Sequence, residues 1–249
     1  MGTWQLTRDT AGTVETALRL GYRMVDTAVD YGTQPGIGEA VARSGVDRSA
    51  IYIVTKVEEN EDAYDATVRN LRQLRLDDVD LVLIHRPPAD GAGRELWAGL
   101  IRAKEEGLTT DIGVSNYSVQ EIEELIDTTA EVPVVNQIEW TPFGWSREML
   151  DYCRERRIAI QAYSPLTRAQ RLDDATLVEI AAACGKTPAQ HLIRWSLQSG
   201  VVPIPKANRH DHLEENLEVF DFELTDEQMA AVNDLNEKWS SLGRSLRYG

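Results

Sequence analysis

The sequence predicts an α/β protein that forms one (β/α)8 TIM barrel over residues 1–249 as a single domain, and three observations lead to this prediction. Short, near-continuous apolar runs alternate with amphipathic stretches almost from end to end, as in a parallel sheet covered by helices. No segment rich in Gly, Pro or Ser divides the chain. No GxGxxG motif opens a helix, which disfavours the alternative fold, a doubly wound open sheet.

Seven of the barrel strands are indicated by apolar runs with turn residues around them. These runs are residues 22–26, 51–56, 80–85, 110–115, 132–137, 158–163 and 201–205. The amphipathic stretches predicted as helices are residues 62–74, 94–105, 119–126, 147–156 and 175–183. Gly21 and Gly107 stand where two helices end, as C-cap chemistry favours. The pattern TDEQ at 225–228 is a capping box that predicts a last helix.

The eighth strand would have to be the first one in the chain, and there the sequence is short. Only Gly2, Thr3 and Trp4 are available before the first predicted helix. We therefore expect a first strand that is truncated at the N-terminus. Either the strand is clipped, or the recorded start lies downstream of the true one.

The composition excludes several classes of partner. A net charge of −15 repels nucleic acid and anionic lipid, so we expect neither as a partner. No apolar stretch reaches the roughly 18–20 residues of a membrane helix, and the start MGTWQL lacks the regions of an export signal. Cys153 and Cys184 have no motif spacing, and we expect both to be reduced core residues. These features predict a cytoplasmic protein.

Lysine is scarce, because arginine supplies most of the 26 basic residues. The five lysines are Lys56, Lys104, Lys186, Lys206 and Lys238. High acid content with few lysines resembles proteins of salt-loving microbes, in which concentrated salt screens the repulsion. An ordinary acidic bias is the alternative. In either case, the lysines that remain are candidates for specific roles.

Polar residues stand at or just after the ends of the apolar runs, where a (β/α)8 barrel carries its functional site. They are Asp26, Lys56, His85, Ser115, Asn116, Gln137, Tyr163, Ser164 and Lys206. Each alone has a structural explanation, since an acid can cap a helix, a histidine can be buried for packing and a lysine can be solvated. All of them around one rim are harder to explain in that way, and they predict a site.

The side chains at or just after the ends of the first three apolar runs suit the transfer of a proton. A phenol has a pKa of about 10, so Tyr31, five residues after Asp26, is a poor acid unless its environment changes. We expect the Lys56 ammonium to lower this pKa, and Asp26 to pair with Lys56 and hold it. His85 could hydrogen bond a substrate oxygen. The set suits protonation of a carbonyl oxygen as a hydride reaches its carbon.

The chain resembles the aldo-keto reductase family over nearly its whole length, and within it a microbial branch similar to 2,5-diketogluconate reductase. The matching segments are GYRMVDTAVDYG, the strand end TK, LDDVDLVLIHRPP, DIGVSNYS, VVNQIEW, AYSPL and IPKANRHDHLEENLEVFDFEL. The resemblance implies a (β/α)8 barrel with a catalytic tetrad of Tyr31, Lys56, Asp26 and His85. It also implies NADPH as the cofactor, bound without a Rossmann motif.

The resemblance further implies which residues bind that cofactor. Ser115, Asn116 and Gln137 would contact the nicotinamide carboxamide, and Tyr163 would stack on its ring. The segment from Ser164 to Leu166 would line the pyrophosphate path. The adenosine end would be held by Lys206, Arg209, His212, Glu215 and Asn216.

Two departures from the family pattern occur at the adenosine end. Ala207 stands where Ser or Thr is common, and His212 stands where arginine is common. Histidine is mostly neutral above its pKa of about 6.5 and cannot make the bidentate phosphate contact of arginine. We therefore expect NADPH to be preferred by a smaller margin than usual, with appreciable NADH use.

The substrate pocket is expected from Trp4, Tyr31 and His85, and the alternative for Trp4 is that it only covers the barrel edge. Arg86, where many relatives carry an aromatic, could with Arg168 favour an acidic or hydroxylated substrate, although both could equally be surface charges. The loops on this rim are short, as in family members that reduce keto-sugars, dicarbonyls and aldehydes.

The resemblance predicts an NAD(P)H-dependent oxidoreductase that converts a small carbonyl compound into an alcohol. The alternative is a regulatory or binding member of the same fold that holds NADPH with little turnover. A metal-dependent barrel hydrolase is disfavoured, because His191, His210 and His212 fall in helical stretches away from His85, and we expect no metal. Many relatives are monomers, so a monomer is favoured over an oligomer.

Overall fold

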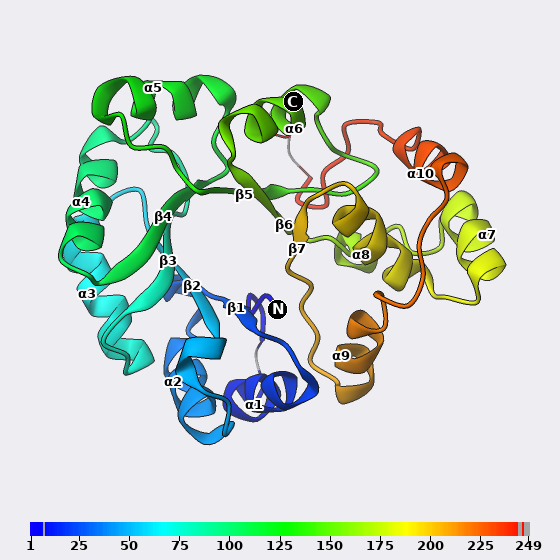
Figure 1. The fold of residues 1–249 in the computed structure, drawn as a ribbon, viewed down its shortest axis with the longest axis horizontal. Coiled ribbons are helices and arrows are strands. Elements are labelled where there is room, and N and C mark those ends of the chain that lie inside the picture. Colours follow the sequence, from blue (N-terminus) through cyan, green and yellow to red (C-terminus); the bar gives the residue numbers. More distant parts are fainter. Residues whose placement is uncertain (7, 244–245, 247–249) are drawn as a thin grey trace.

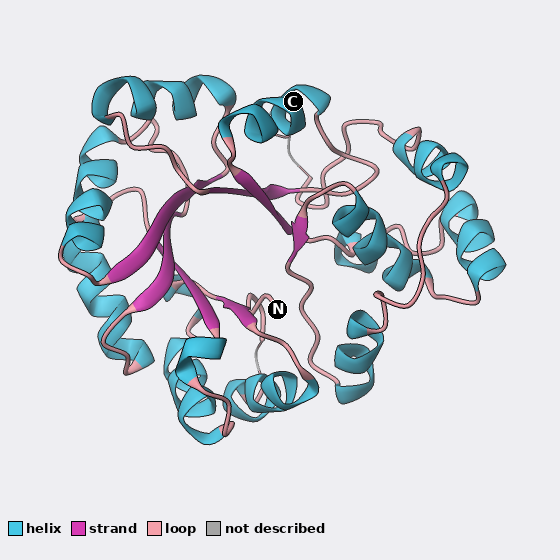
Figure 2. Cartoon of the chain, viewed as in Figure 1, coloured by secondary structure: helices cyan, strands magenta, loops and turns pink. Residues whose placement is uncertain are grey.

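In the computed structural model, which describes residues 1–6, 8–243 and 246, a seven-stranded parallel sheet forms the wall of a barrel. The strands follow one another in chain order, and Figure 1 shows them curling around a central space with the helices outside. The strands are β1 (Met24–Asp26), β2 (Tyr52–Val57), β3 (Val79–Ile84), β4 (Thr109–Ser115), β5 (Val135–Glu139), β6 (Ala159–Tyr163) and β7 (Val202–Pro203). Figure 2 shows the same separation of strands and helices into an inner and an outer layer.

Helices connect successive strands and cover the outer face of the sheet. The α-helices are α1 (Thr10–Leu20), α2 (Gln34–Arg43), α3 (Ala63–Leu74), α4 (Arg94–Glu105), α5 (Val119–Thr129), α6 (Arg147–Arg156), α7 (Ala175–Cys184), α8 (Pro188–Gln198), α9 (His210–Leu217) and α10 (Asp226–Asn233). Three short 3-10 helices are η1 (Val29–Tyr31), η2 (Arg48–Ala50) and η3 (Thr167–Ala169). Among the described helices, none is long and apolar enough to cross a membrane.

Residues 1–3 lie between β1 and the segment after β7, where an eighth strand belongs. On one side, the Gly2 N–H donates to the carbonyl oxygen of Pro205 at 3.1 Å. On the other side, Gly2 forms a parallel bridge with Asp26, whose N–H donates to the Met1 carbonyl at 2.9 Å. The short first strand expected from the sequence is thus present as a segment that bonds to both neighbours. The prediction of a (β/α)8 TIM barrel is confirmed.

The strands are almost wholly apolar because both of their faces are buried. Along β3, Leu81 and Leu83 pack with Val54 of β2 in a small cluster, whereas Val82 and Ile84 belong to the main core with the helices. Successive side chains of a strand point to opposite faces of the sheet. Each strand therefore presents every second residue to the interior of the barrel, which fixes where its last polar residues point.

The capping box and the glycine C-cap predicted from the sequence both lie at helix ends in the structure. The capping box predicted at 225–228 is formed, because the Gln228 N–H donates to the Thr225 hydroxyl and the Thr225 N–H donates to the Gln228 side chain. Gly21, with φ 115°, ends α1 as predicted. Both cysteines are free thiols, as expected. Cys153 is a core residue as predicted, whereas Cys184 is only half-buried, so its placement in the core was wrong.

Two of the strands are shorter than predicted or begin later than predicted. The strand predicted at 201–205 is only Val202–Pro203, and the one predicted at 132–137 begins at Val135. The last backbone bond of this segment to β6 is made by Ile204, whose N–H donates to the Ala162 carbonyl at 3.0 Å. Pro203 and Pro205 have no N–H to extend the pairing, so the chain runs on as a loop toward α9.

Candidate active site

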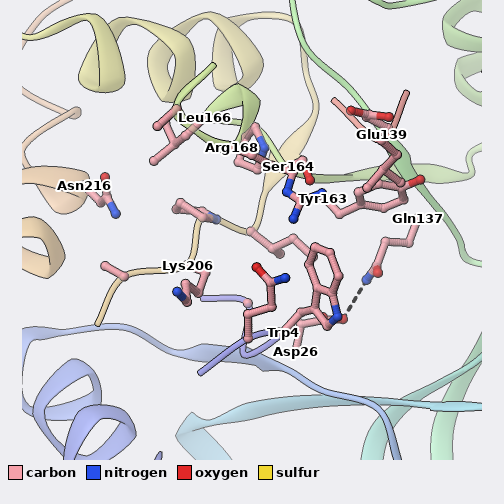
Figure 3. Close-up of a pocket in the computed structure, with 18 of the residues that line it drawn as sticks. Trp4, Asp26, Gln137, Glu139, Tyr163, Ser164, Leu166, Arg168, Lys206 and Asn216 are labelled. Atoms are coloured by element: carbon pink, nitrogen blue, oxygen red, sulfur yellow. Dashed lines mark hydrogen bonds between the residues drawn. The ribbon is translucent and has the colours of Figure 1, made fainter. Parts of the chain in front are cut away.

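A cavity of about 820 Å³ opens at the carboxyl ends of the strands, at the rim where the sequence predicted a site. Its lining includes nearly all of the predicted polar residues, and Figure 3 shows several of them turned toward the same space. The predicted residues that line it are Trp4, Asp26, Tyr31, His85, Ser115, Asn116, Gln137, Tyr163, Ser164, Leu166, Lys206, His212, Glu215 and Asn216. Lys56 lies beneath this surface, and Arg209 lies outside the lining.

A buried ion pair forms the floor of the site. The Lys56 ammonium donates to both carboxylate oxygens of Asp26, at 2.8 and 2.9 Å, and to the Thr27 carbonyl at 2.8 Å. Lys56 is fully buried and Asp26 is 3% exposed. Alternation along β2 turns Lys56 to the same side as Val54, the residue paired with Asp26 in the ladder. The three hydrogen bonds use all three ammonium protons and compensate the loss of water around the charge.

Tyr31 lies directly above this pair. It ends η1, and Gly32, with φ 65°, turns the chain away after it. The Lys56 ammonium is 5.0 Å from the centre of the phenol ring. His85 meets the same ring edge-on, with 5.8 Å between the ring centres.

The expectation that Lys56 lowers the pKa of Tyr31 was wrong for this arrangement. Burial raises the pKa of the phenol well above its ordinary value, and the negative charges of Asp26, Asp30 and Glu58 raise it further. The reason lies in the pairing, because Asp26 already neutralises Lys56. Tyr31 is therefore a firmly protonated phenol.

His85 completes the group from the neighbouring strand. Its N–H continues the β2–β3 ladder by donating to the Val57 carbonyl at 2.9 Å. Its ring nitrogen Nδ1 lies 2.6 Å from a carboxylate oxygen of Glu58. Glu58 was not predicted from the sequence, although it stands two residues after Lys56, just beyond the end of β2, where a polar residue is a candidate for the site.

Next to the proton-handling group, a set of amide and hydroxyl groups lines the cavity from β4 to β6. The Asn116 amide donates to the His85 carbonyl at 3.1 Å and accepts from the Tyr163 hydroxyl at 2.7 Å. The Ser115 hydroxyl donates to the backbone carbonyl of Gln137 at 2.7 Å. Asn116 holds a left-handed conformation, with φ 65°, which asparagine tolerates better than most residues.

The Gln137 side chain links this set to the ion pair. Its amide nitrogen donates to Asp26 at 2.7 Å, which Figure 3 marks with a dashed line, and to Gln161 at 2.9 Å. Both amide protons are thereby used, and the amide oxygen remains to accept a bond from a ligand.

At the far end of the cavity, the charged residues near α9 are arranged differently from expectation. Lys206, His212, Glu215 and Asn216 contribute to the lining, as predicted. The Arg209 guanidinium, however, makes a two-point contact with the Asp211 carboxylate, and both side chains are mostly exposed. Burial lowers the pKa of Lys206. In this structure, Lys206 is thus the predicted phosphate-binding cation that faces the cavity.

The open side of the cavity carries Trp4, Arg86 and Arg168. The Arg168 guanidinium lies 4.8 Å from the centre of the Trp4 ring, a cation–π arrangement. Arg86 lies within 3.9 Å of Glu58 and 4.0 Å of Glu59, so its charge is partly compensated. An acidic substrate would meet less free positive charge here than the two arginines alone suggest.

The lining contains a further buried carboxylate that was not predicted from the sequence. Glu139, 2% exposed, accepts from the Ser240 hydroxyl at 2.6 Å and from the Ser241 N–H at 2.7 Å. It fastens the C-terminal segment to the end of β5. No sequence signal could have found it, because its partners lie about a hundred residues away in the chain.

Among the described residues, Asp30, Glu58 and His85 form a group that could hold a metal ion, because their ligand atoms lie within 4.8 Å of one another. The His85 nitrogen and the Glu58 oxygen are already at hydrogen-bond distance, 2.6 Å. A metal between them at ordinary bond lengths of about 2.0–2.2 Å would push these atoms apart. The arrangement is that of a hydrogen-bonded pair.

The fold and site define a barrel enzyme with a protonated phenol above a buried Lys–Asp pair. Residues 1–237 match the Aldo/keto reductase family, and the chain belongs to this family. As a member, it is an NAD(P)H-dependent oxidoreductase.

Similar proteins agree with this assignment. An aldo-keto reductase of Mycobacterium sp. (strain MCS) is 42% identical over 229 residues, covering 90% of this chain and 81% of that protein. The glyoxal reductase of Bacillus subtilis (strain 168) is 39% identical over 228 residues, covering 90% and 82%. The crystal structure of a Bombyx mori aldo-keto reductase in complex with NADP superposes with a TM-score of 0.91 at 32% identity, covering 97% and 89%.

Proposed function

We propose that this protein reduces a small carbonyl compound to an alcohol with NADPH, and that Tyr31 donates the proton. The substrate class is an aldehyde, ketone, keto-sugar or dicarbonyl. The observation that carries the proposal is the buried Lys56–Asp26 pair beneath Tyr31, at the floor of a cavity that continues to Lys206. The glyoxal reductase of B. subtilis supports the dicarbonyl class, and the NADP complex from Bombyx mori supports the cofactor.

The lining fits a nicotinamide dinucleotide in its donors and acceptors. The amide oxygen of Gln137 and the remaining lone pairs of the Ser115 and Asn116 side chains can accept hydrogen bonds from the NH2 group of the carboxamide. The Tyr163 ring offers an aromatic face, and Lys206 offers a cation for a phosphate. When bound, the nicotinamide supplies a hydride to the carbonyl carbon of the substrate.

Tyr31 is suited to donate the proton because its hydroxyl stays protonated until negative charge develops on the substrate oxygen. Its raised pKa keeps the phenol protonated at neutral pH. As the carbonyl oxygen gains negative charge, it becomes basic enough to take this proton, and an alcohol results. The Lys56 ammonium, 5.0 Å from the ring centre, then stabilises the phenolate that remains. Asp26 holds Lys56 in place, and solvent restores the proton to Tyr31.

The test compares Tyr31→Phe with the wild type in high salt, by following NADPH consumption with methylglyoxal. We expect kcat to fall by about 10²- to 10⁴-fold, because only the proton donor is removed. The affinity for NADPH, measured by fluorescence titration, should stay within about twofold. Tyr64→Phe is the matched control, since Tyr64 is on α3 and bonds to Glu106. Equal rates for Tyr31→Phe and wild type would remove Tyr31 from the mechanism.

The same assay separates the alternative, a member that binds NADPH with little turnover. Tight NADPH binding with no consumption across a broad panel of aldehydes, ketones and keto-sugars would favour that alternative over catalysis.

A further inference from the structure

The contact between Glu58 and His85 is set by the barrel wall. The backbone bond from His85 to the Val57 carbonyl places the residue after β3 beside the residue after β2. The Glu58 carboxylate then reaches Nδ1 of His85 at 2.6 Å. The two side chains are only 16% and 9% exposed, so little water competes for this bond.

Glu58 is ionised in this contact. Burial acts to raise its pKa, but the hydrogen bond from His85 and the positive charges of His85, Arg86 and Lys56 outweigh burial, and the pKa is lowered. An ionised carboxylate only accepts hydrogen bonds. Nδ1 of His85 must therefore carry a proton, and Nε2 is the ring nitrogen left to the cavity.

The proton on Nδ1 determines whether His85 can donate a hydrogen bond to a carbonyl oxygen. On a neutral ring with its proton on Nδ1, Nε2 has only a lone pair and cannot donate to the oxygen. With a second proton on the ring, Nε2 becomes a donor, and the ring forms a charge-assisted pair with Glu58.

We propose that Glu58 is a positioning residue for carbonyl reduction, which fixes the His85 ring through Nδ1 so that Nε2 donates to the substrate oxygen only in the imidazolium form. The inference rests on the proposed function. It makes the second proton on the His85 ring, besides the proton of Tyr31, a requirement for reduction. Reduction therefore declines once the pH is high enough to remove this second proton.

The other groups around His85 are consistent with this role for Glu58. Asp30, from η1, lies 4.0 Å from Nδ1, farther than Glu58, and its side chain is 44% exposed. Arg86 lies on the far oxygen of Glu58, at 3.9 Å, and Lys56 is held by Asp26. Tyr31 meets the ring by its edge, and Asn116 binds only the backbone carbonyl of His85. Among the described residues that line the cavity, Asp30 and Arg86 appear and Glu58 does not, so Glu58 acts through His85.

The kinetic test measures kcat/KM for methylglyoxal reduction against pH for wild type, Glu58→Gln and the control Glu59→Gln, with a chelator present. We expect the wild type to lose activity about tenfold per pH unit on its alkaline limb. Glu58→Gln should move this limb by at least about one pH unit or abolish it, because the new amide no longer pairs with the imidazolium and can itself donate to Nδ1. Glu59→Gln removes an equal charge near Arg86 without touching His85 and should keep the wild-type limb.

A second measurement needs no turnover. Long-range ¹H–¹⁵N spectra of the His85 ring should show Nδ1–H on the neutral ring in the wild type and in Glu59→Gln. An Nε2–H ring in the wild type, or an unchanged limb in an active Glu58→Gln, would overturn the inference alone. A wild type that reduces no carbonyl would overturn the proposed function and, with it, this use of the pair. NADPH affinity and thermal melting check that each variant is folded.

Discussion

The two ends of the cavity hold their charges in opposite ways. At the ends of β1 and β2, Asp26 and Lys56 are buried and bind each other across the two strands. At α9, Arg209 and Asp211 are 68% and 57% exposed and bind each other across two positions of the chain. The backbone hydrogen bonds of the sheet fix the positions of residues at strand ends. At the exposed start of a helix, a charged side chain is free to pair with a neighbour in the sequence. The first end is built for chemistry, and the second can adapt to a ligand.

The largest effect is expected from breaking the buried pair. Lys56→Met leaves the Asp26 carboxylate buried without its counter-charge and should lower the free energy of unfolding by about 3–5 kcal/mol. Urea denaturation without cofactor measures this change. Lys104→Met is the control, because its pair with Glu131 is about a third exposed and should be worth less than about 1 kcal/mol.

Adding a second substitution sharpens the same comparison. In Lys56→Met with Asp26→Leu, neither charge of the pair is left, and most of the lost stability should return. If Lys56→Met alone costs no more than Lys104→Met, the floor of the site is not a desolvated pair, and the contrast between the two ends fails.

A smaller effect is expected at the adenosine end. The wild-type ratio of kcat/KM for NADPH over NADH should stay below about a thousand, since about 4 kcal/mol of discrimination would need more free charge than Lys206 provides. Asp211→Asn releases Arg209 and should lower KM for NADPH about threefold to fivefold, with little change for NADH.

The control for this change is Asp78→Asn, an equally exposed acid that precedes β3 and so lies at the opposite face of the barrel. It should leave both KM values unchanged. If KM fell equally for NADPH and NADH in Asp211→Asn, Arg209 would not contact the 2′-phosphate.

The smallest effect concerns His191, which is buried as deeply as Asp26 but packs against Phe222, with 5.4 Å between ring centres. Burial lowers its pKa below the ordinary 6.5. The unfolded chain therefore binds a proton that the folded chain refuses, so stability is full above about pH 6.5 and falls as the pH drops below it. The slope contributed is at most about 1.4 kcal/mol per pH unit.

Denaturation at several pH values should show a shallower acid slope for His191→Leu than for wild type. His210→Asn, at an exposed histidine on α9, should keep the wild-type slope. Identical slopes in all three proteins would show that the burial of His191 does not oppose its charge.

Much of the fold followed from local chemistry. The apolar runs predicted the strands because a strand buried on both faces must be apolar along its length. The ends of β7 and β5 were predicted poorly, because Pro203 and Pro205 stop the pairing and residues 132–134 precede the ladder. The fold did not depend on these bounds, since the order of elements alone sets the barrel.

The sequence by itself determined that Asp26, Lys56 and His85 meet at one rim, since parallel strands in chain order end there. Only the tertiary structure decided how their charges are shared. It buried Tyr31 beside the negative charges of Asp26, Asp30 and Glu58, so that the pKa of the phenol rises, and it set Glu58 against His85. Residue positions follow from periodicity along the chain, whereas pKa shifts and proton placement depend on burial and on distances of a few ångströms between segments, which no local pattern encodes.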